Sequence, residues 1–157
     1  MSSKNCTFLV LIDNSSEMPT ALKFACLRAN SCGGRVALAH VLEDSIGGEN
    51  WLSVTELAKA QAREDAEKLM EKHGNTVIRY TGHMPTFFIR EGNTPEEIAK
   101  LIDEESSISI LVLASSTSQT NPGPVINYFL RKGVGCMRIP ITIVPGDISD
   151  SVLEDLT

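Results

Sequence analysis

The chain has 157 residues, of which 42% are hydrophobic, 22% charged and 5% aromatic, a composition typical of one globular domain with a sizeable core. Its formal net charge of −6 and its lack of a Lys/Arg cluster argue against nucleic acid as a partner. No run approaches the roughly 18 apolar residues of a membrane span, and the N-terminus lacks the apolar core of a signal peptide. We therefore expect a cytoplasmic protein that is not bound to a membrane.

The first predicted element is a strand over residues 8–12, a continuous apolar run of the kind that a parallel sheet buries on both faces. A helix is expected to begin near Ser16, with Glu17 and Pro19 in its first turn. It is expected to end at Gly33, because glycine is the usual residue at a helix C-cap.

A second strand is predicted over residues 35–41, followed by a glycine-bearing loop over residues 45–50. Ser53 and Glu56 have the spacing of a capping box, which predicts the start of a long amphipathic helix. This helix is expected to end near Gly74.

Residues 77–80 fit either a short strand or an extended approach to the next strand. The third core strand is predicted over residues 86–89. The next helix is expected to begin with Thr94 as its cap, Pro95 at its first position and Glu97 three residues after the cap.

A fourth strand, buried on both faces, is predicted over residues 110–113. A hydroxyl-rich loop follows it over residues 114–121, and then a short helix with Val125 and Phe129 on its apolar side. The fifth strand is predicted over residues 139–144, where a proline favours a strand start or an edge position. The acidic tail that follows it is expected to be mobile or loosely packed.

Strands and helices therefore alternate along the whole chain. This pattern predicts an α/β fold with an open five-stranded parallel sheet and helices on both faces. We expect a single domain over residues 1–157, with a core over about residues 7–146 and an acidic tail over residues 147–157.

Five segments, in this order and spacing, resemble the universal stress protein family over about residues 7–146. They are FLVLIDNSS, AHVLED, IREGNTPEEIAKLI, ISILVLASS and IPITIVPGD. The resemblance implies a Rossmann-like sheet similar to that of adenine-nucleotide hydrolases. It also implies a homodimer that pairs through the last strand, with candidate interface residues Ile139, Ile141, Ile143 and Val144.

In nucleotide-binding members of that family, the loop after the fourth strand reads Gly, two residues, Gly, nine residues, then Gly with Ser or Thr. Glycines of this kind let backbone N–H groups close on phosphate. The corresponding residues here are Ala114, Thr117 and Asn127-Tyr128, and Pro122 and Pro124 also remove two N–H donors. The usual phosphate-binding loop is therefore expected to be missing.

Other positions match the family better. The resemblance places Asp13 and the backbone of Val41 near the adenine, although an Asp at a strand end also suits turn capping. The serine-rich loop offers hydroxyl and N–H groups to an anion, or is simply a solvated loop. The candidate nucleotide contacts are Asp13, Val41, Ser115, Ser116, Thr117, Ser118 and Asn127.

No catalytic or metal centre is expected. His40 suits a hydrogen-bonded strand histidine, and the four cysteines have no metal-type spacing and are expected to be reduced. Ser115 lacks the G-x-S-x-G context of a hydrolase nucleophile. The leading hypothesis is a dimeric, non-enzymatic stress-response module without the usual ATP-binding loop. The alternative is an ATP- or AMP-binding member with a non-standard loop and slow ATP hydrolysis.

Overall fold

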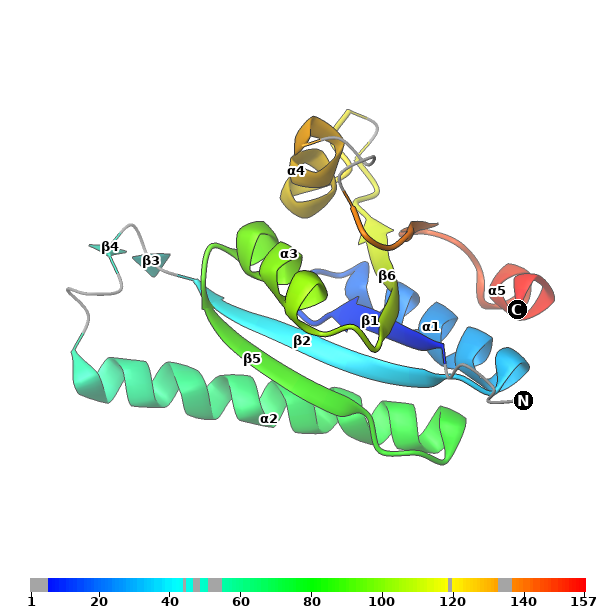
Figure 1. The fold of residues 1–157 in the computed structure, drawn as a ribbon, viewed down its shortest axis with the longest axis horizontal. Helices are drawn as coiled ribbons and strands as arrows, with labels where there is room; N and C mark the ends of the chain where they lie inside the picture. Colours follow the sequence, from blue (N-terminus) through cyan, green and yellow to red (C-terminus); the bar gives the residue numbers. More distant parts are fainter. Residues whose placement is uncertain (1–5, 44, 47–48, 51–54, 119, 133–136) are drawn as a thin grey trace.

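The computed structural model describes residues 6–43, 45–46, 49–50, 55–118, 120–132 and 137–157 and has the predicted α/β architecture (Figure 1). The main sheet contains β1 (Thr7–Leu11), β2 (Arg35–Glu43), β5 (Thr86–Gly92), β6 (Ile108–Ser115) and β7 (Ile141–Pro145). The helices are α1 (Met18–Cys32), α2 (Glu56–Thr81), α3 (Thr94–Glu104), α4 (Pro124–Lys132) and α5 (Asp150–Leu156).

The five strands of the main sheet are parallel and lie in the order β5-β2-β1-β6-β7. The chain therefore moves outward from β1 to β2 and β5, then returns to the other side of β1 and continues through β6 to β7. The strand order changes direction between β1 and β6. In open parallel sheets, ligands bind beyond the carboxyl ends of the strands at such a position.

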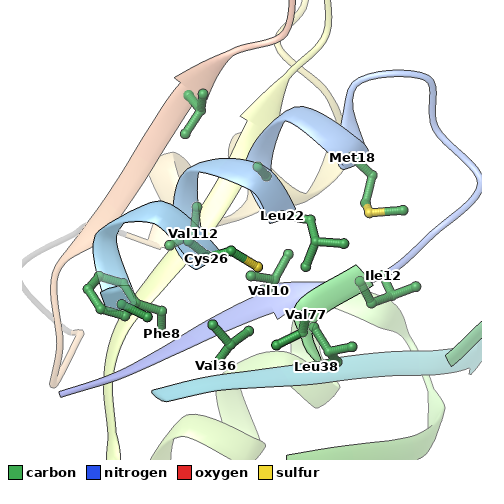
Figure 2. Close-up of a cluster of buried hydrophobic side chains, with 14 of the residues drawn as sticks. Phe8, Val10, Ile12, Met18, Leu22, Cys26, Val36, Leu38, Val77 and Val112 are labelled. Atoms are coloured by element: carbon green, nitrogen blue, oxygen red, sulfur yellow. The ribbon is translucent and has the colours of Figure 1, made fainter. Parts of the chain in front are cut away.

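Two layers of helices cover the sheet. One core joins β1 to α1, α2 and α5, and Figure 2 shows Val10 of β1 and Ile12, just after it, pointing toward Leu22 and Met18 of α1. The other core joins the opposite side of β1, through Leu9, to α3 and α4. The alternation of β1 side chains between the two cores agrees with the prediction of a strand buried on both faces.

The prediction for the end of α2 was wrong, because the helix continues through Gly74 to Thr81 and ends at Gly82 in the left-handed conformation. Residues 77–80 are therefore helical, with Val77 in the core, and form neither a strand nor an extended segment. Gly74 has a packing role: a Cβ there would lie 2.6 Å from Cζ of Phe87 on β5. The glycine leaves room for that ring against the helix. In the sequence alone, the same glycine has the appearance of a helix end.

Two predicted helix caps are shifted along the chain. Thr55 is the N-cap of α2 and accepts a hydrogen bond from the Ala58 N–H at 3.2 Å, whereas Ser53 lies outside the described residues. Asn93 is the N-cap of α3, which makes Thr94 the first helical residue.

The predicted third strand is present as β5, which lies at one edge of the main sheet, because β2 is its sole partner among the described strands. One further prediction needs correction. The loop predicted over residues 45–50 contains a short antiparallel hairpin of β3 (Ser45–Ile46) and β4 (Glu49–Asn50).

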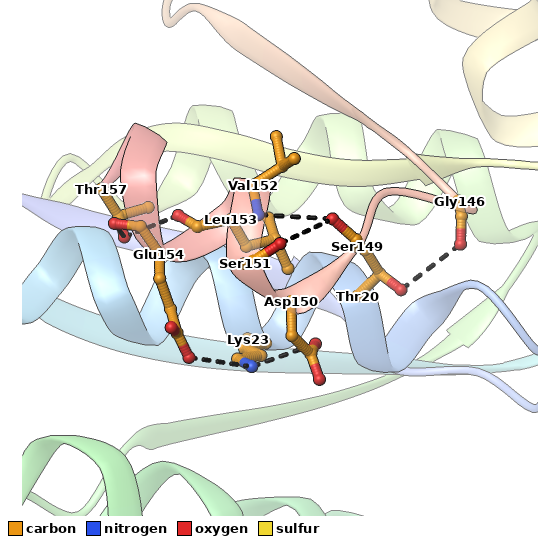
Figure 3. A network of polar contacts seen from close by, with 10 residues as sticks. All are labelled: Thr20, Lys23, Gly146, Ser149, Asp150, Ser151, Val152, Leu153, Glu154 and Thr157. Carbon is orange, nitrogen blue, oxygen red and sulfur yellow. Dashed lines mark hydrogen bonds and ion pairs between the residues drawn. The ribbon is translucent and has the colours of Figure 1, made fainter.

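The acidic tail is not loosely packed. Its residues form α5, whose N-cap Ser149 accepts a hydrogen bond from the Val152 N–H at 3.3 Å. Leu153 is 1% exposed within the core shared with α1. On the surface, Lys23 Nζ of α1 lies 3.0 Å from Oδ1 of Asp150 and 3.8 Å from Oε1 of Glu154 (Figure 3). Within the described ranges, no helix is long and apolar enough to cross a membrane.

Candidate functional site

A pocket of about 310 Å³ lies at the carboxyl ends of β1 and β6, where the strand order changes direction. We call it the β1–β6 pocket. The residues that line it are Leu11, Asp13, Asn14, Ser15, Glu17, Met18, Ala21, Leu113, Ala114, Pro122, Gly123, Pro124, Val125 and Ile126. Its floor comes from the strand ends, and its opposite walls come from the loop between β1 and α1 and the loop between β6 and α4.

The first wall is the β1–α1 loop, residues 12–17. Asp13 Oδ1 accepts hydrogen bonds from the Ser15 N–H at 2.9 Å and the Ser15 Oγ–H at 2.5 Å, which forms a compact turn directly after the strand. Glu17 is the N-cap of α1 but makes no side-chain capping bond. Both carboxylate residues border the pocket.

The second wall is the β6–α4 loop, residues 116–123, described here apart from residue 119. The N–H groups of Ser116, Ser118, Thr120 and Gly123 donate to acceptors within the loop. The Ser116 N–H donates to the Pro122 carbonyl at 2.9 Å, and the Ser118 N–H donates to Ser116 Oγ at 3.2 Å. The Thr120 N–H donates to Ser118 Oγ at 3.4 Å. These donors are the groups that a phosphate-binding loop would offer to its anion.

Directly before α4, the Asn121 side chain bonds a backbone amide and a side chain of the helix. Asn121 Oδ1 accepts a hydrogen bond from the Gly123 N–H at 3.0 Å and another from Asn127 Nδ2 at 2.7 Å. Gly123 has φ = +123°, a conformation that favours glycine. The two flanking residues, Pro122 and Pro124, have no N–H to donate.

The charge on the pocket wall is negative. Asp13 and Glu17 are the ionisable residues among those that line it, and the lining contains no Arg, Lys or His. Most of the remaining lining is apolar, including the buried side chains of Leu11, Met18 and Ile126. An anion in this pocket would meet two carboxylates and no compensating cation from the lining.

The predicted nucleotide contacts are only partly brought together. Asp13 lines the β1–β6 pocket, but Val41 borders a neighbouring hollow of about 600 Å³, which shares Asn14 with the pocket. Asn127 borders a third hollow of about 600 Å³, which shares Pro124 with the pocket. Ser115, Ser116, Thr117 and Ser118 lie beside the pocket and are absent from its lining.

The sequence reading missed several residues that build the pocket. Glu17, Met18 and Ala21 fall in or beside the first predicted helix and Val125 and Ile126 in the predicted short helix, and none of them is among the candidate nucleotide contacts. A signal was present, since the two helices that follow β1 and β6 must begin at the same sheet edge. Their first turns were therefore candidates for the pocket walls.

The other candidate chemistry has structural explanations. His40 Nδ1 lies 2.7 Å from the carbonyl oxygen of Ile12, which agrees with the predicted hydrogen-bonded strand histidine. Cys26 is buried, and desolvation raises the pKa of its thiol to about 12. Across the described part of the chain, no group of three or more His, Cys, Asp and Glu side chains is placed to hold a metal ion.

The predicted interface residues lie on or beside the edge strand β7. Ile139 and Val144 are buried in the cores, Ile141 is half-buried, and Ile143 is 45% exposed. Among the described strands, β6 alone pairs with β7, so the outer edge of β7 has no strand beside it in the single chain. The exposed Ile143 is the interface candidate that a second chain could cover without rearrangement.

Comparison with known proteins assigns the family. A model of the universal stress protein family matches residues 6–133. The chain belongs to the universal stress protein family. No match was found among curated protein sequences.

Solved structures agree in fold with this universal stress protein. The hypothetical protein MJ0577 has a TM-score of 0.71 at 22% identity, over 94% of this chain and 100% of that one. The universal stress protein UspA from Lactobacillus plantarum has a TM-score of 0.67 at 16% identity, over 91% and 99%. A universal stress protein from Archaeoglobus fulgidus in complex with dAMP has a TM-score of 0.57 at 15% identity, over 90% and 99%.

Proposed function

We propose that this universal stress protein is a cytoplasmic, homodimeric regulatory module that does not hold ATP through the phosphate-binding loop usual in its family. The observation that carries the proposal is the bonding of the β6–α4 loop. Its Ser116, Ser118, Thr120 and Gly123 N–H groups already donate to acceptors of the same loop. Phosphate would have to replace these bonds, and the two prolines offer no further donors.

The proposed mode of action is binding rather than catalysis. The polar side chains of the β1–β6 pocket are Asp13, Asn14, Ser15 and Glu17, and the pair in which a hydroxyl meets a carboxylate is Ser15 and Asp13. Ser15 Oγ donates to Asp13, but the same carboxylate oxygen also accepts the Ser15 N–H, as in a structural turn. A regulatory role requires a partner surface, and the outer edge of β7 supplies one for a second copy of the chain.

A nucleotide-binding role is the second candidate. It is favoured by the position of Asp13 at the pocket and by the universal stress protein from Archaeoglobus fulgidus that was solved with dAMP. In this alternative, ATP or AMP enters the β1–β6 pocket and the serine-rich loop rearranges around the phosphates, with slow ATP hydrolysis as a further outcome.

Nucleotide binding separates the two candidates. The protein is purified without nucleotide, denatured to release any ligand it carried, and separately titrated with ATP and AMP by calorimetry. The proposal predicts no released adenine nucleotide and no ATP binding in the submillimolar range. Submillimolar ATP binding that Asp13→Ala abolishes would establish the second candidate instead.

The dimer is tested separately by light scattering, with a charge placed on β7. Ile143→Glu is expected to shift the protein toward the monomer mass of 17.1 kDa, because the carboxylate would be buried in the proposed interface. Leu130→Glu is the matched control, since Leu130 is 57% exposed on α4. A wild-type protein that is monomeric at high concentration would contradict the dimer.

A further inference from the structure

The charge and shape of the β1–β6 pocket limit the kind of molecule that it can bind. The inference about this ligand rests on the proposed function, in which the pocket does not bind phosphate. The volume of about 310 Å³ is at the lower end of the range for small-molecule sites. Such a space suits a heterocycle or a nucleoside better than a nucleoside triphosphate. The ligand considered is therefore small.

The body of the ligand would lie against apolar groups. Leu11 and Leu113 form the floor from neighbouring strands, and Met18 and Ile126 face it from the first turns of α1 and α4. All four side chains are buried in the two cores, so the surface that they offer is fixed by packing on their far sides. Such a surface favours a flat or compact apolar body.

The polar end of the ligand would face carboxylates. Asp13 and Glu17 border the pocket from the same wall, while the cationic side chains of α4, Arg131 and Lys132, border the separate hollow near α3. An anionic group would be repelled, and a group with N–H donors or positive charge would be attracted. Fewer donors are free for an anion, because the Ser116, Ser118 and Gly123 N–H groups of the opposite wall are already bonded within their loop.

We infer that the β1–β6 pocket binds a small molecule with an apolar body and an uncharged or positively charged polar end, and that it discriminates against phosphate esters. This selectivity is the reverse of the one expected from a phosphate-binding loop. It assigns the two carboxylates of the β1–α1 loop as the residues that determine specificity. The apolar floor supplies affinity without regard to charge.

A charge series on one molecular body tests the inference. The probes are 5′-amino-5′-deoxyadenosine, adenosine and AMP, which share an adenine and a ribose and carry a cation, no charge and an anion at the 5′ position. The adenine body is chosen because a related solved structure contains dAMP. Binding to the full-length protein is measured by calorimetry at low ionic strength, where screening is weakest.

The expected affinity decreases from the amine to adenosine to AMP, with AMP at least about tenfold weaker than adenosine because of the carboxylates. In the double variant Asp13→Asn/Glu17→Gln, the three affinities are expected to converge. The matched control is Glu71→Gln/Asp155→Asn, which changes the net charge equally at exposed positions outside the pocket and should preserve the order.

Three results would overturn the inference. AMP binding more tightly than adenosine would reverse the selectivity and would also contradict the proposed function. No detectable binding of any probe at millimolar concentration would overturn the inference alone and leave the proposed function intact. Convergence of the affinities in the control variant as well as the pocket variant would show that net charge, and not the pocket, sets the order.

Discussion

The β1–α1 loop and the β6–α4 loop face each other across one pocket but use their polar groups differently. The first is short, brings Asp13 and Glu17 to the pocket and leads into α1, which is backed by α2 and α5. The second is longer, and amide N–H groups in it donate hydrogen bonds to its own Ser116 and Asn121 side chains. It leads into α4, which packs on α3. The position of the pocket follows from strand order, whereas its chemistry follows from the two loops.

The largest expected effect on stability comes from removing a side chain of α5 that packs against α1, the helix that follows the first loop. Leu153→Ala deletes a buried side chain of α5 and is expected to lower the free energy of unfolding by about 2–5 kcal/mol. Urea denaturation measures the change. Leu156→Ala on the same helix is the control, because Leu156 is 61% exposed and should cost no more than about 0.5 kcal/mol. Equal effects would mean that α5 does not support α1.

Gly146, just after β7, lies between Glu17 of the first wall and the carboxyl end of β6. A Cβ at this position would collide with the Ser115 carbonyl oxygen and lie 2.9 Å from Cβ of Glu17. Gly146→Ala is therefore expected to cost about 1–3 kcal/mol of stability through overpacking. Thermal denaturation would show it as a lower Tm, and an unchanged Tm would contradict the close approach.

The self-bonding of the second wall is tested by Asn121→Ala. This substitution removes the acceptor of the Gly123 N–H and is expected to cost about 1 kcal/mol in urea denaturation. Asn127→Ala is the control, because it removes one donor but leaves the Asn121–Gly123 bond in place. If AMP binding strengthens in Asn121→Ala but not in Asn127→Ala, the freed amide is an anion donor that the native loop withholds.

The smallest expected effect is a pH dependence of the free energy of unfolding, which arises in α2, the helix that packs behind α1. Burial, with repulsion from Lys72, holds the pKa of His73 on α2 below its ordinary value. The unfolded chain therefore binds a proton at His73 more readily. The stability contributed by the neutral histidine is fully present above about pH 6.5 and is lost as the pH falls toward the lower pKa of the folded state.

Urea denaturation at pH 7.5 and 5.5 checks this contribution. The loss of stability at the lower pH is expected to be smaller in His73→Gln than in wild type, because the substituted side chain binds no proton. His83→Gln is the control, since His83 is exposed in the turn after α2. An equal loss in both variants would assign the pH dependence to other groups.

The fold could be predicted because its strands are recognisable as isolated apolar runs. Residues 8–11 lie in β1 and residues 110–113 lie in β6, and a continuous apolar run of this kind is typical of a strand covered on both faces. The end of α2 was predicted wrongly because a glycine usually marks a helix end. Gly74 instead fits against Phe87, which belongs to a strand later in the chain. Local signals cannot report a contact of that kind.

The structure of the tail and the residues of the pocket were harder to predict from the sequence, for different reasons. Ser149 and Leu153 were a cap and an apolar anchor visible in the sequence, but the acidic residues around them suggested a solvated end. For the site, the resemblance names Asp13 as a candidate nucleotide contact, and Asp13 lines the β1–β6 pocket. The resemblance gave no information on Glu17, or on the bonding of Asn121 to the amide of Gly123, because these depend on loop conformation.

The packing of α5 and the pairing of β1 with β2 set where the two ends of the described chain emerge. The Thr157 carbonyl accepts a hydrogen bond from the Ser31 Oγ–H at the end of α1. The Cys6 carbonyl accepts a hydrogen bond from the Arg35 N–H at the start of β2. Both ends therefore lie at the amino edge of the sheet, close together in Figure 1 and opposite the β1–β6 pocket. A fluorescent protein or an immobilising tag joined after Thr157 would leave the pocket open, so surface-based and fluorescence-based ligand screens can use that attachment point.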